Sequence, residues 1–515
     1  MIRKRSSYWQ LRVLVLLGFL SVNALKAQWV TIPDAHFVSC LQALVPAAMN
    51  GNLMDTTHPA VTTTTHRMQV SKKAIADLTG IQYFHALTYL DCSNDSLAML
   101  QSLPNSIDSL VCDTNKLGSI SALPASLLYL TCRSNILVTL PVFPVNTRTV
   151  DCRYNHLDTL NLLPAALHTL ICSQNRINNL PALPTGLQVL RCDWNNLNTL
   201  PALPNTLTYL SCYDNNILSL PVFPASLTFI DCADNFITTM PALPASLLYL
   251  FCQNDAFGSL PPLPSGLVIL YCNLNPLSAG LPQLPASLTF LNCSNDVLKI
   301  LPPLPPLLDT LHCEGNRHLT TLPALPSKLR YLNCSNDSLT LIPPIPGSLL
   351  ALNCQTDFLT SLPQLPDSIQ AILCGSNQIH CFPVFPPSIT TLTIDPNPYG
   401  CVSNHIPAMG ADTVTHPLCG PVNQYNCPMA SNIGIRQYSE NTEGLHVFPN
   451  PSTGSFSISC EQVAAWLQVT DVLGRIVFWI KPQGETQQLQ LKTPGVYFIR
   501  VSMPSGIQTG KAVVK

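Results

Sequence analysis

The sequence predicts a mainly β solenoid, built from short stacked repeats, followed by a small antiparallel β-sandwich. Cysteines recur every 20 or 21 residues, leucines and prolines keep a fixed phase between them, and this pattern stops before residue 431. Such a period is typical of solenoids, in which each coil buries its apolar face only against its neighbours. The fifteen cysteines of this column are Cys92, Cys112, Cys132, Cys152, Cys172, Cys192, Cys212, Cys232, Cys252, Cys272, Cys293, Cys313, Cys334, Cys354 and Cys374.

Each repeat combines a short strand with an extended return segment. In the unit LPALPNTLTYLSCYDNNILS we number from Leu207 as position one, which puts Leu210 at position four and Cys212 at position six. Side chains alternate along a strand, so positions four and six share one face and predict a parallel sheet over an apolar core. The prolines of the LPxLP half favour an extended, polyproline-like convex side without a helix.

The repeat resembles the leucine-rich repeat, LxxLxLxxNxL, with cysteine in place of the third apolar residue. Position nine carries Asn or Asp, as at Asn215, and an apolar residue such as Ile217 follows. The LPxLP half resembles the short bacterial class found in secreted effectors, among them ubiquitin ligases. About 16 such repeats are predicted over residues 87–398.

Both ends of a solenoid must be covered, because an open terminal coil exposes core and unpaired backbone. Residues 28–86 are expected to form an N-terminal cap with a degenerate first repeat. A short capping helix is predicted there, with Asp34 as N-cap and Phe37, Leu41 and Leu44 on its apolar face. The phrases IPDAHF and IADLTGIQYF resemble the entry region of internalin-like bacterial surface proteins. Residues 399–430, where the period fails, are the expected C-terminal cap and linker.

Export is indicated at the start of the chain. Arg3, Lys4 and Arg5 precede an apolar run over residues 13–20, which predicts a cleaved signal peptide over residues 1–27. No later apolar run is long enough for a membrane-spanning helix, so the mature chain is expected to have no transmembrane segment.

The last segment, residues 431–515, carries the phrases HVFPNPSTGSFSI, LQVTDVLGRIVF, PGVYFIRV and GKAVVK. Their alternating apolar residues, bounded by Gly, Pro and Asn, predict the antiparallel sandwich. Their order and spacing resemble the type A C-terminal sorting domain of the bacterial type IX secretion system. That resemblance implies that this secretion machinery is a partner and that the protein is secreted, or held on the outer surface, by a Gram-negative bacterium.

The column cysteines are expected to be buried free thiols. In-register parallel neighbours keep their Cβ atoms near the strand spacing, beyond the roughly 3.5–4.5 Å that a disulfide needs. Outside the column, an exported protein can keep disulfides, and we predict that Cys381 pairs with Cys401 and Cys419 with Cys427, although four cysteines allow three pairings. Cys40 and Cys460 have no assigned partner.

Neither the charge nor the motifs favour an enzyme or a nucleic-acid binder. Only 10% of residues are charged and the net charge is -2, which lacks the basic character of nucleic-acid-binding proteins. The twelve histidines lack metal-ligand spacing, and CxxC, HExxH and GxSxG are absent from the sequence. We therefore predict no catalytic activity, cofactor or metal.

Aromatic residues gather at positions that point away from the core, on the concave side of the predicted sheet. Exposed aromatics are common anchors of protein interfaces and of sugar stacking, so a protein or glycan ligand is predicted, most simply for an adhesin. The alternative is a structural surface spacer whose aromatics only stabilise the sheet through cross-strand pairs. The ligand-binding candidates are Trp194, Tyr209, Tyr213, Phe229, Tyr249, Phe251, Tyr271 and Phe290.

Overall fold

The computed structural model describes residues 28–515, except for residues 101, 411–414, 421–422, 428–444, 461–465, 473–474, 483 and 504–505. The predicted signal peptide, residues 1–27, lies outside the described residues. The chain forms two compact units, Met1–Met429 and Ala430–Lys515, which are described separately.

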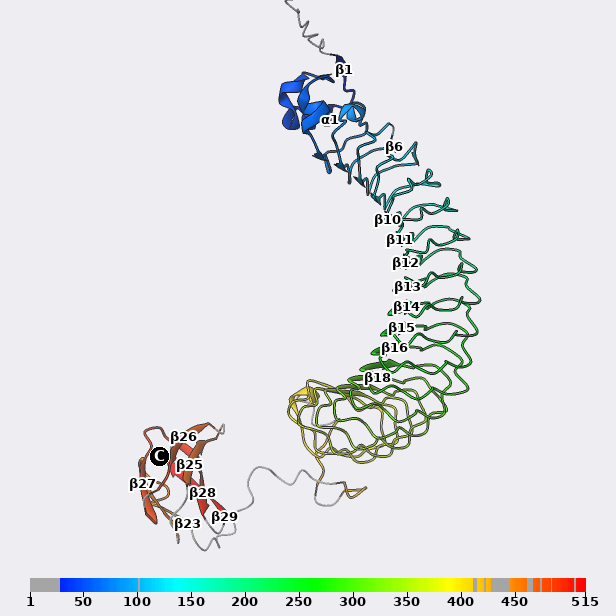
Figure 1. The fold of residues 1–515 in the computed structure, drawn as a ribbon. Helices are drawn as coiled ribbons and strands as arrows, with labels where there is room; N and C mark the ends of the chain where they lie inside the picture. The colour runs from blue at the N-terminus through cyan, green and yellow to red at the C-terminus, as the bar shows by residue number, and fades with distance from the viewer. Residues whose placement is uncertain are drawn as a thin grey trace, which may run out of the picture. The chain divides into compact units, whose positions relative to one another are not determined.

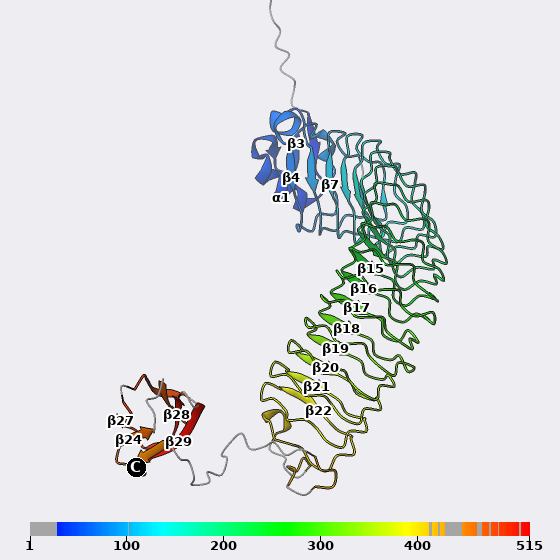
Figure 2. The same ribbon diagram turned by 60° about the horizontal axis from the view of Figure 1, so that its bottom comes forward.

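The first unit is a stack of coils whose short parallel strands line the concave side of a curve (Figure 1, Figure 2). The strands pair in chain order, each in parallel with the next, and sixteen coils run from β5 to β22. This confirms the predicted mainly β solenoid. The strands are β4 (Arg67–Gln69), β5 (Tyr89–Asp91), β7 (Ser109–Val111), β9 (Tyr129–Thr131), β10 (Thr149–Asp151), β11 (Thr169–Ile171), β12 (Val189–Arg191), β13 (Tyr209–Ser211), β14 (Phe229–Asp231), β15 (Tyr249–Phe251), β16 (Ile269–Tyr271), β17 (Phe290–Asn292), β18 (Thr310–His312), β19 (Tyr331–Asn333), β20 (Ala351–Asn353), β21 (Ala371–Leu373) and β22 (Thr391–Thr393). Two further short strands, β6 (Met99–Leu100) and β8 (Ser119–Ile120), pair in parallel beside them.

The core of the solenoid lies beneath positions one, four and six. Leu207, Leu210 and Cys212 are fully buried, and all fifteen column cysteines are buried free thiols, as predicted. Burial raises the pKa of these thiols, to about 12 for Cys374 at the end of the column. They therefore stay protonated and pack as small apolar side chains.

In most coils, a buried asparagine amide at position nine connects the coil to the coil before it. The Nδ2 of Asn135 donates to the carbonyl oxygens of Cys112 and Cys132, both at 3.1 Å, and its Oδ1 accepts from the backbone N–H of Leu117 at 3.0 Å. The same contacts recur in neighbouring coils, for example at Asn155. This asparagine ladder satisfies buried backbone groups that the three-residue strands leave unpaired.

In some coils aspartate replaces asparagine at position nine, and the side-chain N–H donor of the amide is then missing. The Oδ1 of Asp255 still accepts from the N–H of Ile237 at 3.0 Å, and that of Asp357 from Leu339 at 3.1 Å. The second carboxyl oxygen of each is buried without a hydrogen-bond partner among the described residues. Burial raises the pKa of Asp255 to about 8 and that of Asp357 to about 7. A protonated carboxyl group has the donor that the carboxylate lacks, so burial favours the neutral form of both aspartates.

We expect the double variant Asp255→Asn, Asp357→Asn to lose less stability than the wild type as the pH rises, while Asp296 and Asp337, whose pKa values burial also raises, titrate in both proteins. In the wild type the folded pKa values of Asp255 and Asp357 exceed the ordinary carboxyl value near 4, so their contribution to stability is full below about pH 4 and is lost as the pH rises from there through about 7–8. Asparagine donates at every pH, which adds roughly 1 kcal/mol per restored hydrogen bond at alkaline pH. Thermal unfolding followed by circular dichroism at pH 5 and pH 9 measures the difference.

The exposed substitution Asp158→Asn is the control and should leave the pH profile unchanged. An equal loss of thermal stability between pH 5 and pH 9 in the wild type and the double variant would show that the two buried aspartates are ionised in the folded protein.

The N-terminal cap combines a small antiparallel sheet of β1 (Trp29–Thr31), β2 (Met49–Asn50) and β3 (Leu53–Asp55) with α1 (Ala35–Leu44) and the single turns η1 (Pro46–Ala48), η2 (Ala60–Thr64) and η3 (Ile81–Tyr83). Asp34 caps α1 as predicted: its Oδ1 accepts from the N–H groups of His36 and Phe37. Its Oδ2 accepts from the N–H groups of Ala76 and Asp77, which attaches the helix to the first coil.

The predicted apolar face of this helix is wrong at its last residue. Leu44 is 44% exposed, whereas Phe37, Val38 and Leu41 are buried. The helix ends at Leu44, and the chain turns at Val45, whose side chain takes the inner place and is only 2% exposed.

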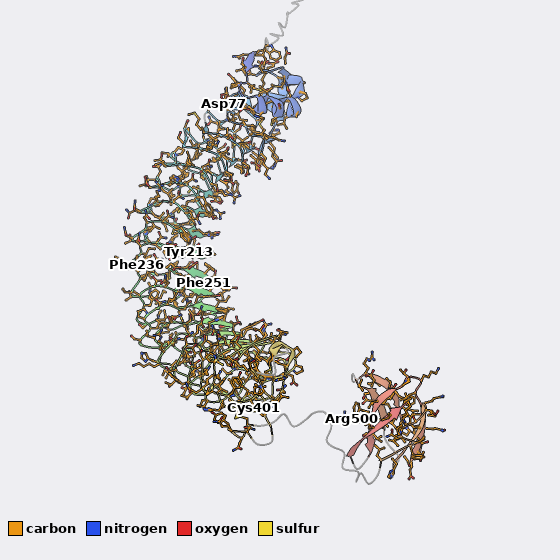
Figure 3. All side chains as sticks on the ribbon, turned by 180° about the vertical axis from the view of Figure 1, so that it is seen from behind. Asp77, Tyr213, Phe236, Phe251, Cys401 and Arg500 are labelled. Carbon is orange, nitrogen blue, oxygen red and sulfur yellow. A yellow bond between two sulfur atoms is a disulfide. The ribbon has the colours of Figure 1, made fainter. Side chains whose placement is uncertain are left out.

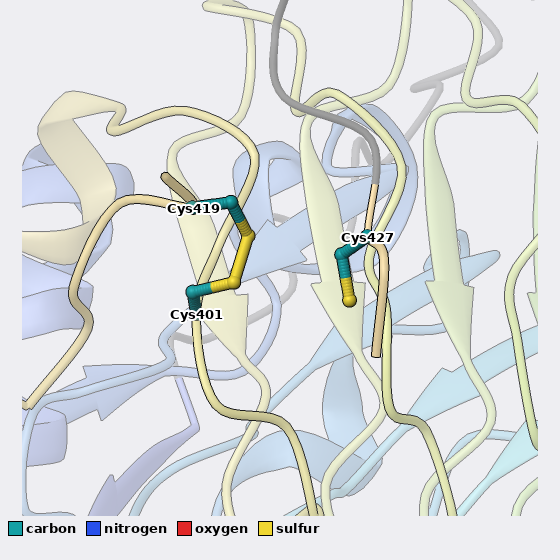
Figure 4. Close-up of side chains that lie close together, drawn as sticks. All are labelled: Cys401, Cys419 and Cys427. Atoms are coloured by element: carbon teal, nitrogen blue, oxygen red, sulfur yellow. A yellow bond between two sulfur atoms is a disulfide. The ribbon is translucent and has the colours of Figure 1, made fainter. Parts of the chain in front are cut away.

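The disulfide pairing predicted for the C-terminal cap is also wrong. Cys381 is bonded to Cys427. Cys401 is bonded to Cys419, a disulfide that Figure 4 shows. Cys381 and Cys401 do occupy equivalent places in successive coils, but residues stacked in this way lie near the strand spacing, too far apart for a disulfide. The geometry that keeps the column cysteines free therefore also excludes the predicted pair.

The observed pairs follow from the path of the chain through the cap. After Cys401 the chain makes the turn η4 (Pro407–Met409) and comes back, so that Leu418 pairs with Val402. This bridge brings Cys419 beside Cys401. One disulfide thus cross-links two parts of the cap, and the other, through Cys427, links the cap to the coil that contains Cys381.

We expect non-reducing peptide mapping by mass spectrometry to recover one linked peptide holding Cys381 and Cys427 and another holding Cys401 and Cys419. In a Cys381→Ser variant the second link should persist and Cys427 should become available to a thiol reagent. Recovery of a Cys381–Cys401 peptide from the native protein would contradict the observed path of the cap.

The second unit is the predicted antiparallel sandwich. One sheet contains β23 (Leu445–Phe448), β24 (Ser455–Cys460) and β27 (Thr486–Gln490); the other has the order β26 (Ile476–Ile480), β25 (Trp466–Asp471), β28 (Gly495–Met503) and β29 (Gly506–Val514). Phe456 and Ile458 of the first sheet pack with Val469 and Ile499 of the second in one apolar core.

Candidate binding surface

A row of aromatic rings crosses the concave face of the solenoid from β13 to β17. Tyr209 stacks on Phe229 with ring centroids 4.2 Å apart and planes 4° from parallel, and Phe229 lies 5.4 Å from Phe251. Phe251 continues to Tyr271 at 5.1 Å, and Tyr271 to Phe290 at 4.6 Å. We call these five residues the aromatic ladder. It steps from position three to position five and back, which keeps neighbouring rings in contact over five coils.

The ladder rings contact one another along the row, and a charged or aromatic side chain lies near each end. The guanidinium carbon of Arg191 lies 6.0 Å from the Tyr209 ring centroid at one end, and the His312 ring lies 5.8 Å from Phe290 at the other. All five ladder residues are half-buried as a result. Burial raises the pKa of Tyr209 and of Tyr271 above the ordinary tyrosine value. The ladder therefore offers ring edges to solvent, while the ring faces contact each other.

The remaining aromatic candidates flank the ladder. Tyr249 is 36% exposed, with its ring centroid 6.2 Å from that of Phe229. The indole N–H of Trp194 donates to the hydroxyl of Tyr213, and the two rings meet edge to face at 5.9 Å. Figure 3 shows Tyr213 and Phe251 near the strands, away from Phe236 on the outer side. The structure thus brings all eight candidates to one surface.

Trp194 occupies a backbone conformation that disfavours its side chain. Position eight of the coils has positive φ, and φ is 53° at Trp194. Asparagine and aspartate tolerate this left-handed region, as at Asp214 and Asp234, but a bulky aromatic residue costs about 1 kcal/mol or more there. The 48% exposed side chain of Trp194 is therefore not explained by the stability of its own coil.

The charges beside the ladder are negative. Arg191 lies 3.7 Å from Asp193, which also accepts from the hydroxyl groups of Ser173 and Ser211. Burial raises the pKa of Asp231, at position five of β14, to about 7. Between Arg191 and Lys299 the sequence contains six aspartates and no lysine, arginine or histidine.

Two of these aspartates, Asp214 and Asp234, lie in successive coils at position eight. Burial and then the charge of Asp234 raise the pKa of Asp214. Asp234 accepts from the side-chain amide of Asn254 at 2.6 Å. Asp214 and Asp234 are not among the site residues predicted from the sequence, although the 107 residues from 192 to 298, which contain no basic residue, indicate an acidic region.

The described residues also bear on two other features, a metal site and a membrane-spanning helix. The sulfur atoms of Cys401, Cys419 and Cys427 lie within 4.8 Å of one another, but all three belong to disulfides and offer no thiolate to a metal. Within the described parts of the chain, no helix has the length and apolar character needed to cross a membrane.

Comparisons with known proteins agree with this architecture. Residues 446–515 match the family model of the secretion system C-terminal sorting domain. The solved structure of YopM from Yersinia enterocolitica is 33% identical, with a TM-score of 0.62, over 64% of this chain and 73% of that one. A leucine-rich effector protein from Yersinia pestis, also YopM, is 27% identical, with a TM-score of 0.45, over 67% and 86%. The functional domain of InlJ from Listeria monocytogenes, described as including a cysteine ladder, is 19% identical, with a TM-score of 0.48, over 95% and 100%.

No match was found among curated proteins. The match to YopM and the parallel solenoid show that the chain belongs to the bacterial leucine-rich repeat proteins, here joined to a type IX secretion sorting domain. The sorting domain indicates that the protein is exported.

Proposed function

We propose that this protein is a non-catalytic recognition protein that binds a protein or glycan ligand through the aromatic ladder and its flanks, as an adhesin does. The secretion machinery would deliver it to the outside of a Gram-negative cell. The observation that carries the proposal is the ladder: five coils in the middle of the concave face present a continuous aromatic strip.

Two features support a ligand over a purely structural role. Aromatic side chains are the usual anchors of interfaces because they bury a large area with few rotatable bonds. In addition, Trp194 keeps a 48% exposed side chain in an unfavourable backbone conformation, and the charge of Asp234 raises the pKa of Asp214, so both features carry a cost in the isolated fold.

The second candidate function is a surface spacer without a specific ligand. The stacked geometry favours it, because cross-strand aromatic pairs stabilise a sheet by roughly 0.2–1 kcal/mol each. The half-buried rings of the ladder satisfy that role without any partner.

A triple variant, Tyr209→Ala, Phe251→Ala, Tyr271→Ala, separates the two. The purified full chain would be screened on arrays of glycans and of cell-surface proteins. If the ladder is the binding surface, the triple variant should lose the hits of the wild type because the contact area is gone. Circular dichroism would show that it still folds.

The control is Phe236→Ala, which removes a 58% exposed ring on the outer side of a coil and should leave every hit in place. Hits that survive in the folded triple variant, or a wild type without hits, would favour the spacer.

A further inference from the structure

The contacts within the ladder restrict the chemical class of its partner. A sugar stacks its C–H groups on an open aromatic face, and three of the four contacts within the ladder are stacked, face against face, while the fourth, between Phe229 and Phe251, is tilted by 37°. At the two ends, Arg191 and His312 lie near the outermost rings. What the ladder presents is a narrow apolar strip of ring edges, which suits the packing of aliphatic and aromatic side chains of a protein.

The charges beside the strip select the partner further. Asp231 ends β14 of the ladder, Asp214 and Asp234 follow β13 and β14 in the same coils, and the charge of Arg191 is offset by its ion pair with Asp193. The coils that carry the ladder contain no other basic residue between residues 192 and 298. Interfaces pair potentials of opposite sign, so an acidic border on an apolar strip fits a cationic apolar surface.

We infer that the ladder binds a protein segment that presents lysine or arginine side chains beside apolar ones. This inference rests on the proposed function, because it names the partner class of the same surface. The apolar side chains pack on the ring edges, and the cations reach Asp214 and Asp234 at position eight of adjacent coils. Binding is therefore expected to weaken as salt rises.

Asp214 and Asp234 allow a nearly isosteric test. Both have positive φ, 53° and 55°, a conformation that asparagine adopts at least as readily as aspartate. Asp214→Asn with Asp234→Asn thus removes two charges and keeps the coil. Asp367→Asn, on an exposed turn outside the ladder coils, is the matched control for loss of charge.

The probes are three fluorescent 12-residue peptides, in which leucine alternates with arginine, glutamate or serine, together with a glycan array. Anisotropy titration of the full chain should show binding of the arginine–leucine peptide above the other two. The double Asp→Asn variant should weaken that binding roughly ten-fold, about 1.4 kcal/mol, and Asp367→Asn should leave it unchanged. The ladder triple variant should abolish it.

The outcomes separate this inference from the proposed function. If the Asp→Asn variant binds the arginine–leucine peptide like the wild type while the triple variant does not, the cationic partner is ruled out and the ladder stands as a binding surface. A glycan hit that disappears in the triple variant would likewise rule out the cationic protein partner and keep the ladder as a binding surface. Peptide binding that survives in the triple variant overturns the ladder itself, and equal or no binding of all three peptides overturns the inference.

Discussion

The solenoid depends on the buried amide at position nine. Its strands are only three residues long, so strand pairing leaves backbone groups of every coil without partners in the core. The asparagine side chain reaches two carbonyl groups and one N–H group, as Asn135 does across two coils. Unpaired buried groups cost about 1–3 kcal/mol each, so the asparagine contributes strongly to the stacking of one coil on the next.

The fixed register that follows shapes both faces of the sheet. On the inner face it places cysteine over cysteine at the strand spacing, which is close enough to pack and too distant to bond. On the concave face the same register places ring over ring, so that aromatic residues in successive coils stack. Because the inner positions carry the core, residues at positions three and five can vary more freely, and Tyr209 and Phe251 lie at these positions.

The sequence is informative wherever repetition dictates the chemistry. The spacing of the cysteines gives the period and with it the parallel sheet, and the alternation of side chains along a strand gives the burial of positions four and six. The structure has all three features. The disulfides do not follow, because Cys419 and Cys427 are placed by an irregular return of the chain through η4 that leaves no periodic pattern. The half-burial of the ladder cannot be predicted from the sequence either. It depends on how the side chains pack, for example where the row passes from Phe229 at position three to Phe251 at position five.

Aspartate plays two different physical roles in the same coils, and this bears on what the concave face is for. Asp255 lies inside the coil, where burial raises its pKa to about 8, and it is a poor substitute for asparagine. Asp231, on the ladder, has a pKa of about 7, so it lowers the stability of the fold as the pH rises through that value. A cation from a partner would stabilise its ionised form and reverse that cost. The charge beside the ladder is therefore unfavourable for the isolated solenoid and favourable for a complex, which a spacer alone would not require.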